Sequence, residues 1–165
     1  MNIFVLDVKP SKAAEMLCNC HVRKMCMETA QILSGVMLRR KLELLRDMPK
    51  LQNLNHPVIV AADSDPVDDA LDWVLNYNFA LHKEYAKRFG HCHAYSVLTL
   101  KYINELWSGG DGDCTKLSKC CGDLDVEDLD IVTAYRKYYT EVKKPALANQ
   151  KLWKFTNRED WTIQQ

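Results

Sequence analysis

The chain has 165 residues, of which 47% are apolar and 27% charged, so it is long enough to bury one hydrophobic core without disulfides or metals as staples. Its 22 basic and 22 acidic residues cancel, which argues against a protein that coats nucleic acid non-specifically. No stretch approaches the roughly 18 apolar residues that cross a bilayer, and no signal peptide is recognisable, so we expect neither a membrane-spanning nor a secreted protein.

The charges are nevertheless unevenly placed along the chain. Residues 61–72 carry five aspartates and no base, whereas residues 136–158 carry seven Lys/Arg against the single acid Glu141. The basic C-terminal segment is therefore a candidate to follow a phosphate backbone.

The first half of the chain predicts an extended arm followed by a long helix. Asn2 to Asp7 is too short and too apolar for a surface helix, so we expect a buried extended arm. Ser11 is the predicted N-cap of a helix that starts at Lys12 and is bent or broken at Gly35. The apolar pattern then continues through Leu45 until Pro49 stops it.

Further helices follow with turn residues between them. A loop is expected around Asn53–Pro57, and a helix that opens at Pro66 with Asp65 as its cap is expected to end at Gly90. The remaining predicted elements are a helix over 94–107, a Gly/Asp loop over 108–125, a helix over 127–143 and an irregular aromatic-basic tail after Pro145.

These patterns predict an all-α fold, a single-domain helical bundle with a buried extended N-terminal arm. Its predicted segments are the arm (1–10), a helical core (11–107), the Gly/Asp loop (108–125) and a C-terminal helix with its tail (126–165). No pattern indicates an oligomeric state.

A polar stripe lies beside the apolar face of the first long helix. At 100° per residue, His21, Lys24, Glu28 and Gln31 gather on one side, with Glu28 and His21 at the edge of the buried face. One interpretation makes Glu28 a partly desolvated acid/base or cation stabiliser. The other is a solvated helix edge with an ordinary Lys24–Glu28 pair, and periodicity alone favours this second interpretation.

Seven cysteines raise the question of a disulfide or metal framework. Their number is odd, and Cys18, Cys20 and Cys26 sit close together in a predicted helix, which favours free thiols in a reducing cytosol. Cys-x-Cys-His on one helix splays its side chains around the axis, unlike a zinc knuckle. We therefore predict no metal site and no cofactor, with a zinc-stabilised binding module as an alternative.

Two polar segments outside this helix are candidate contacts for nucleic acid. Asn55 and His56 lie in a polar loop, where His56 could hold a phosphate or a base edge, or simply brace the turn. Arg136 and Lys137 alternate with tyrosines over 135–139, as in surfaces that stack bases and hold phosphates. On a helix, however, these tyrosines share one face, which slightly favours a role in the core.

The stretch Cys18–Leu33 contains the pattern His-x6-Glu-x2-Gln-Ile-Leu, and it is followed by Asn55-His56-Pro57 and by a helix that ends in Arg88-Phe89-Gly90. In this order and spacing, the first 90 or so residues resemble the pyrimidine-dimer DNA glycosylase family, typified by phage endonuclease V. The resemblance implies an all-helical domain whose N-terminal α-amine attacks C1′ of a damaged nucleotide, with a Schiff base as intermediate and strand cleavage by β-elimination.

The resemblance also implies roles for particular residues. Glu28 corresponds to the glutamate that stabilises the cationic sugar and moves protons, and His21 corresponds to a histidine one heptad earlier. Met1 would carry the amine, because the bulky Asn2 disfavours removal of the initiator methionine, whereas the classical enzyme exposes a small second residue. Met27 and Gln31 stand where the classical enzyme has arginines near its glutamate, which weakens phosphate clamping there.

We therefore expect a DNA glycosylase or AP-lyase-like enzyme that acts on a damaged or modified nucleotide, in the cytoplasm of a bacterium or a phage-infected cell. Met1, His21 and Glu28 are the expected catalytic residues. The expected substrate contacts are Lys24, Gln31, Asn55, His56, Arg136 and Lys137. The alternative is a non-catalytic module that keeps the fold and binds nucleic acid or protein, as the neutral charge and the missing arginines suggest.

Overall fold

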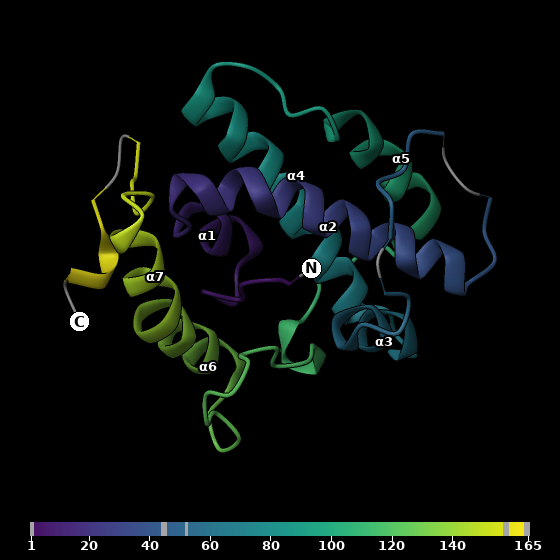
Figure 1. Ribbon diagram of the computed structural model, residues 1–165. Helices are drawn as coiled ribbons and strands as arrows, with labels where there is room; N and C mark the ends of the chain where they lie inside the picture. Colours follow the sequence, from purple (N-terminus) through teal and green to yellow (C-terminus); the bar gives the residue numbers. More distant parts are fainter. Residues whose placement is uncertain (1, 44–45, 52, 157–158, 164–165) are drawn as a thin grey trace.

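The computed structural model describes residues 2–43, 46–51, 53–156 and 159–163, and in these ranges it is all-helical and contains no strand (Figure 1). Its α-helices are α1 (Pro10–Glu15), α2 (Asn19–Arg39), α3 (Pro57–Ser64), α4 (Asp69–Phe89), α5 (Ser96–Leu106), α6 (Ile131–Tyr138) and α7 (Lys144–Asn149). The all-α single-domain prediction is confirmed. None of the described helices is both long enough and apolar enough to cross a membrane.

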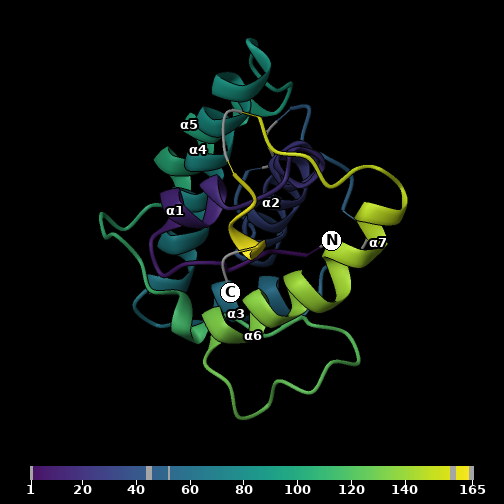
Figure 2. The same ribbon diagram turned by 90° about the vertical axis from the view of Figure 1, so that its left-hand side faces the viewer.

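The N-terminal arm is extended and buried, as predicted. Its four residues Ile3–Leu6 are each at most 2% exposed. The arm runs between α2 and α6, since the Phe4 ring lies 4.7 Å from the ring of His21 in α2 and 6.3 Å from that of Tyr138 in α6, measured between centroids (Figures 1 and 2). An extended apolar segment, not a helix, therefore fills this part of the core.

The sequence predicts one long helix from Lys12, and the structure has two. α1 begins at Pro10, so Ser11 lies inside the first turn and the N-cap prediction is wrong. After α1, the guanidinium of Arg88 in α4 donates to the carbonyl oxygens of Glu15 at 2.8 Å and Leu17 at 2.6 Å. These carbonyls are satisfied by a distant side chain, which stabilises the break between the two helices.

The predicted break at Gly35 is wrong, because α2 runs through this position to Arg39. A Cβ at residue 35 would lie 2.5 Å from Cδ1 of Ile59, so the glycine lets α3 pack closely on α2. The predicted continuation of the helix towards Pro49 is also wrong, since Lys41 takes a positive φ of 54°. Leu45 lies outside the described residues.

α3 was not predicted from the sequence, which places a loop at Pro57. Pro57 is instead the first residue of α3, and His56 is its N-cap, with Nδ1 accepting the Val58 N–H at 3.3 Å. A proline in the first turn removes only an N–H that has no helical partner, so it begins this helix without cost.

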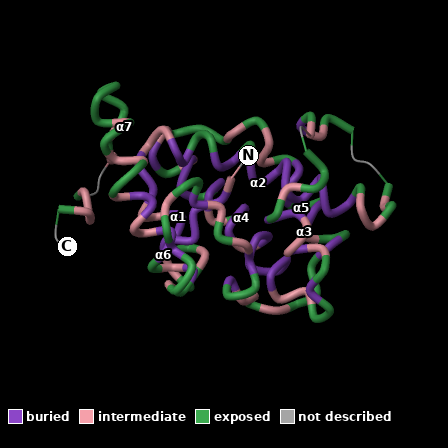
Figure 3. Tube along the Cα trace, turned by 60° about the horizontal axis from the view of Figure 1, so that its bottom comes forward, coloured by how far each residue is buried: buried purple, intermediate pink, exposed green. Residues whose placement is uncertain are grey.

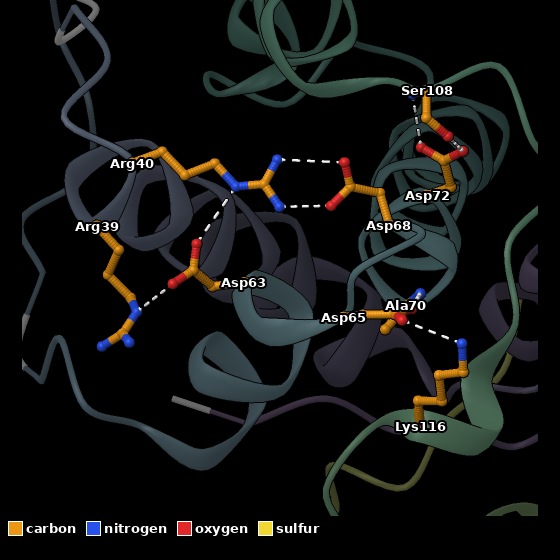
Figure 4. A network of polar contacts seen from close by, with 9 residues as sticks. All are labelled: Arg39, Arg40, Asp63, Asp65, Asp68, Ala70, Asp72, Ser108 and Lys116. Atoms are coloured by element: carbon orange, nitrogen blue, oxygen red, sulfur yellow. Dashed lines mark hydrogen bonds and ion pairs between the residues drawn. The ribbon is translucent and has the colours of Figure 1, made fainter.

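The prediction that Pro66 opens the next helix is wrong, because α4 begins three residues later, at Asp69. Asp65 lies before the helix but still caps its first turn, because its Oδ2 accepts the Ala70 N–H at 3.0 Å (Figure 4). The predicted inner face of α4 is confirmed, with Leu71, Val74, Leu75, Asn78, Leu81 and Tyr85 all buried, and Gly90 ends the helix at φ 74°.

The C-terminal helix begins later than the sequence predicts, and helical structure continues past its predicted end at Lys143. Asp130 accepts the amide hydrogens of Val132 and Thr133 and so caps α6 at Ile131. A π-type turn over Tyr139–Lys143 then leads into α7, where an irregular tail is expected. This wider turn comes just before Pro145, whose missing N–H would interrupt a regular helix.

The tyrosines near this junction belong to the core, as periodicity slightly favours. Tyr135 and Tyr139 are fully buried and Tyr138 is 8% exposed. No residue of α7 is buried, and Figure 3 shows the burial concentrated in the central helices instead. The rings of all three tyrosines pack against Phe4 of the arm, with centroid distances of 5.2–6.4 Å.

Candidate active site

Glu28 lies in the middle of α2 and is only 3% exposed. Its Oε2 accepts a hydrogen bond of 2.9 Å from the main-chain nitrogen of Asn2, and its Oε1 lies 3.3 Å from Nζ of Lys24. A buried carboxylate thus joins the start of the arm to a lysine whose side chain is 58% exposed. The carboxylate, a possible proton acceptor, is therefore buried, while the lysine with which it pairs is in contact with solvent.

The polar stripe on this helix is mostly buried. His21, Glu28 and Gln31 are 6%, 3% and 8% exposed, so the interpretation as a solvated helix edge is wrong for these three and holds for Lys24. Burying a charged carboxylate is costly unless partners compensate, and here the Asn2 amide and the lysine do so.

His21 braces the arm. Its Nδ1 lies 2.8 Å from the hydroxyl of Tyr139, which also accepts the Cys18 N–H at 2.9 Å, and its ring packs on Phe4. Seven residues of helix separate His21 from Glu28 by about 10 Å along the axis. The two expected catalytic side chains therefore lie at different points along the arm, and sequence reasoning missed the Tyr139 hydroxyl that holds one of them.

A second buried hydroxyl belongs to Tyr77, which has no hydrogen-bond partner among the described residues. Burial raises the pKa of Tyr77 well above its ordinary value of 10.0, and the carboxylate of Glu28 raises it further. Tyr77 therefore stays a neutral hydroxyl at physiological pH. No sequence pattern distinguishes it from an ordinary core tyrosine.

Arg136 holds the end of the arm. Its Nε donates to the carbonyl oxygen of Leu6 at 2.7 Å, and its Nη2 lies 3.3 Å from Oδ2 of Asp7. Lys137 points elsewhere and donates to the carbonyl oxygen of Asp125 at 3.2 Å. Both predicted phosphate contacts are thus engaged with the protein's own backbone.

Gln31 and the 53–56 loop form another group of contacts. Nε2 of Gln31 donates to the carbonyl oxygen of Lys50 at 2.8 Å, and Oδ1 of Asn55 accepts from Nη1 of Arg39 at 3.3 Å. His56 caps α3. These side chains brace the connection between α2 and α3, and no contact described here brings Asn55 or His56 to Glu28.

Figure 4 shows the ion pairs that aspartates of the acidic segment 61–72 form with basic side chains. Arg39 and Arg40 both bind Asp63, at 2.7 and 3.3 Å, and Arg40 also pairs with Asp68. Asp65 pairs with Lys116 at 3.0 Å. Because these partners belong to the protein, the acidic segment is largely neutralised internally and the two arginines are held by aspartates.

A groove of about 860 Å³ opens beside the far end of the arm, away from Glu28. Its lining includes Val8, Lys9, Asn76, Phe79 and Lys83. None of the expected site residues that the structure describes lines it. Glu28 and this groove therefore belong to different parts of the molecule.

Among the described residues, two clusters have the donor atoms to hold a metal: Cys18, Cys20 and His21, and Cys26, His82 and His93. In the first, the Cys18 and Cys20 sulfurs lie 3.4 Å apart. The hydrogen bond from Cys20, with help from His21 and Tyr139, lowers the pKa of Cys18 to about 4. The sulfurs and the His21 Nδ1 are thus already engaged with one another or with Tyr139.

Comparison with known families identifies the first part of the chain. The model of the family described as pyrimidine dimer DNA glycosylase matches residues 1–95, which is more than half of the chain and includes the arm, α2 and all of α4. No curated protein and no solved structure gives a significant match. On the strength of the family match, the chain belongs to the pyrimidine dimer DNA glycosylase family.

Proposed function

We propose that this protein is a DNA glycosylase with an AP-lyase-like second step, which acts at the N-glycosidic bond of a damaged or modified nucleotide. Glu28 moves protons and stabilises the cationic sugar, and the α-amine at the beginning of the chain, carried by Met1 in the sequence, is the nucleophile. DNA is the partner in this proposal.

The hydrogen bond of 2.9 Å between the Asn2 nitrogen and Glu28 carries the proposal. Met1 lies outside the described residues, but it is bonded to Asn2, and one residue spans no more than about 3.8 Å. An α-amine on Met1 is therefore within reach of Glu28, directly or through one water. If the methionine is removed, the Asn2 nitrogen itself becomes the amine and already contacts the carboxylate.

The proposed reaction uses these two groups in sequence. The amine lone pair attacks C1′, the base departs with the electrons of the glycosidic bond and gains a proton, and the attacking nitrogen loses one. The nitrogen lone pair then forms the C=N bond of a Schiff base as the C1′–O4′ bond breaks, and O4′ takes up a proton. Removal of a C2′ proton then expels the 3′ phosphate, and water hydrolyses the Schiff base to release the enzyme. Glu28 shuttles the protons in these steps.

Lys24 is a rival nucleophile, because its amine lies 3.3 Å from the same carboxylate. The resemblance to the family assigns the nucleophile to the α-amine instead, and the position of a trapped adduct separates the two.

The test is reductive trapping on abasic-site DNA. The protein is incubated with the DNA and cyanoborohydride, which reduces a Schiff base to a stable amine, and the adduct is mapped by mass spectrometry after proteolysis. We expect the DNA on the first residue of the chain, and no adduct after selective acetylation of the α-amine. Glu28→Gln is expected to slow trapping by about 10²-fold or more, while the exposed Glu141→Gln leaves it unchanged.

An adduct on Lys24 would overturn the assignment of the nucleophile. If no adduct forms, no base is released from dimer-containing or otherwise modified DNA, and Glu28→Gln behaves like wild type, the enzymatic proposal fails. A non-catalytic module that keeps the fold would then be the remaining function.

A further inference from the structure

Cys26, His82 and His93 converge from three separate parts of the chain. Cys26 lies on α2, His82 on α4, and His93 in the connection that follows Gly90. One ligand atom from each lies within 4.8 Å of the other two. The His82 and His93 ring centroids are 5.6 Å apart.

His82 is the unusual member of this cluster. The residue is 7% exposed, and neither of its ring nitrogens has a hydrogen-bond partner in the described part of the chain. Buried polar atoms are normally satisfied, and one without a partner requires an explanation such as a missing ion. An imidazole that faces a thiol and a second imidazole is typical of a soft or borderline metal site.

We propose that Cys26, His82 and His93 bind one Zn²⁺ ion. A thiolate and two neutral imidazoles are ordinary zinc ligands, and three protein ligands leave the fourth tetrahedral position to a water or a further group. This proposal does not rest on the proposed DNA chemistry.

The arrangement needs only a small adjustment to reach zinc geometry. Bond lengths of about 2.0–2.3 Å put the ligand atoms of a tetrahedral site about 3.3–3.8 Å apart, so atoms that now lie within 4.8 Å of one another approach by at most about 1.5 Å. Coordination through Nε2 of His93 moves the ring proton to Nδ1 and ends the 3.2 Å hydrogen bond that this atom accepts from the Tyr95 amide. At 3.2 Å this bond lies at the long end of the usual range, and its loss is part of the cost of binding.

Zinc binding also involves protons. A thiol must lose its proton to become a ligand, and the positive charge of a zinc ion makes this loss favourable. Zinc binding is therefore expected to release a proton from Cys26.

The ion would have a structural role. Cys26 and Glu28 are two residues apart on α2 and therefore point about 200° apart around the helix axis. Zinc at Cys26 would tie α2 to α4 and to the chain after Gly90, on another side of the helix from the carboxylate. We expect its removal to lower the melting temperature.

The proposed zinc ligands do not form a sequence motif, unlike a second group of cysteines on α2. The Cys18-x-Cys20-His21 run is conspicuous in the sequence, but its atoms contact one another and Tyr139. Cys26 and His82 are 56 positions apart in the sequence and have no spacing motif. Only the packing of α2 on α4 brings them together.

The experiment measures metal content and coordination on the full chain. Protein expressed with zinc in the medium is freed of loose metal and analysed for elemental zinc. It is then stripped, reconstituted with Co²⁺ under reducing conditions and examined by absorption spectroscopy. We expect about one zinc per chain, and a cobalt spectrum with tetrahedral d–d bands and a thiolate charge-transfer band.

Matched variants locate the ion. His93→Gln, at a half-buried position, is expected to lose the zinc and the cobalt spectrum, while the nearby His91→Gln keeps both. Cys20→Ser tests the other cluster and is expected to keep both as well. His93→Gln should retain the far-ultraviolet circular dichroism of a helical protein.

Two results would overturn the proposal. One is wild-type protein with less than about a tenth of an equivalent of zinc and no thiolate band with cobalt, a result that depends on no variant. The other is zinc that survives His93→Gln or is lost in Cys20→Ser, because the ion would then belong elsewhere.

Discussion

The main-chain nitrogen of Asn2 donates a hydrogen bond of 2.9 Å to Oε2 of Glu28, 26 residues further along the chain. The Asn2 side chain adds a second anchor, donating to the carbonyl oxygen of Cys120 at 3.0 Å. The arm is therefore fastened at its start to the middle of the central helix. A carboxylate in this position stabilises the fold as well as serving the proposed chemistry.

The first prediction separates these two roles of Glu28. Glu28→Gln keeps an acceptor for the Asn2 N–H, so we expect the free energy of unfolding to change by less than about 1 kcal/mol. Glu28→Ala leaves that N–H without its partner and is expected to cost about 1–3 kcal/mol. Urea denaturation measures both. Equal losses in the two variants would show that the Asn2 contact does not stabilise the arm.

The second prediction concerns Lys24 as a phosphate contact. Its ion pair is exposed on the lysine side, so Lys24→Gln is expected to change the free energy of unfolding by less than about 1 kcal/mol. If Lys24 binds a phosphate, the variant lowers the slope of log affinity against log salt by about one for DNA with a non-cleavable abasic analogue. Lys101→Gln, an exposed lysine on α5, serves as the control. An unchanged slope in Lys24→Gln would remove Lys24 from the interface.

The third prediction tests whether Arg136 serves the arm or the DNA. Arg136→Ala leaves the carbonyl oxygen of Leu6 without its donor, and we expect a loss of about 1–3 kcal/mol in the free energy of unfolding. The neighbouring Lys137→Ala removes only an exposed contact to the Asp125 carbonyl and is expected to cost less than about 1 kcal/mol. Weaker DNA binding in Arg136→Ala with unchanged stability would contradict the bracing role.

Local patterns predict the middle of the helices well and their ends poorly. The periodicity of Leu71, Val74 and Leu81 identifies the buried face of α4, and Gly90 identifies its end, because both depend on neighbouring residues. The break between α1 and α2 depends on Arg88, some 70 positions away in sequence. No window of sequence around Cys18 contains that information.

In the candidate site too, local sequence predicts some features and distant contacts determine others. Helical spacing places Glu28 at the edge of a packed face, and family resemblance singles it out from other polar residues of α2. The Asn2 contact and the Tyr139 hydroxyl that meets His21 arise only when the arm threads between α2 and α6. The Asn-His-Pro loop and the alternation of bases with tyrosines single out Asn55 and Arg136, but only the structure shows that Arg39 and the Leu6 carbonyl are their partners.

The fourth prediction concerns the Gly-rich loop. Gly112 has φ 80°, and a Cβ there would collide with the backbone of Trp73 and Asp72 in α4. Gly112→Ala is therefore expected to cost about 2 kcal/mol or more in the free energy of unfolding, since backbone atoms cannot move aside cheaply. Gly122→Ala is the matched control, with φ 63° and open space around its Cβ, and is expected to cost about 1 kcal/mol. Equal losses of unfolding free energy in the two variants would mean that the loop does not pack closely on the α4 backbone at Gly112.

The fifth prediction concerns pH and the capping carboxylate Asp65. The Ala70 N–H, with help from Lys116, lowers the pKa of Asp65 below its ordinary value of 3.8. A carboxyl whose folded-state pKa is depressed stabilises the protein above its unfolded pKa, and this stabilisation is lost as the pH falls through the folded value. Asp65→Asn is therefore expected to be less stable than wild type at pH 7. This gap, the difference in free energy of unfolding between the two proteins, is expected to close below about pH 4.

Urea denaturation at a series of pH values measures this gap. The exposed Asp111→Asn is the control and is expected to follow wild type at every pH. Because the amide side chain of the Asp65→Asn variant retains an acceptor oxygen for the Ala70 N–H, its difference from wild type reports the charge, which also pairs with Lys116 at 3.0 Å. A gap that stays constant down to about pH 2 would show that the charge of Asp65 contributes nothing to holding the start of α4.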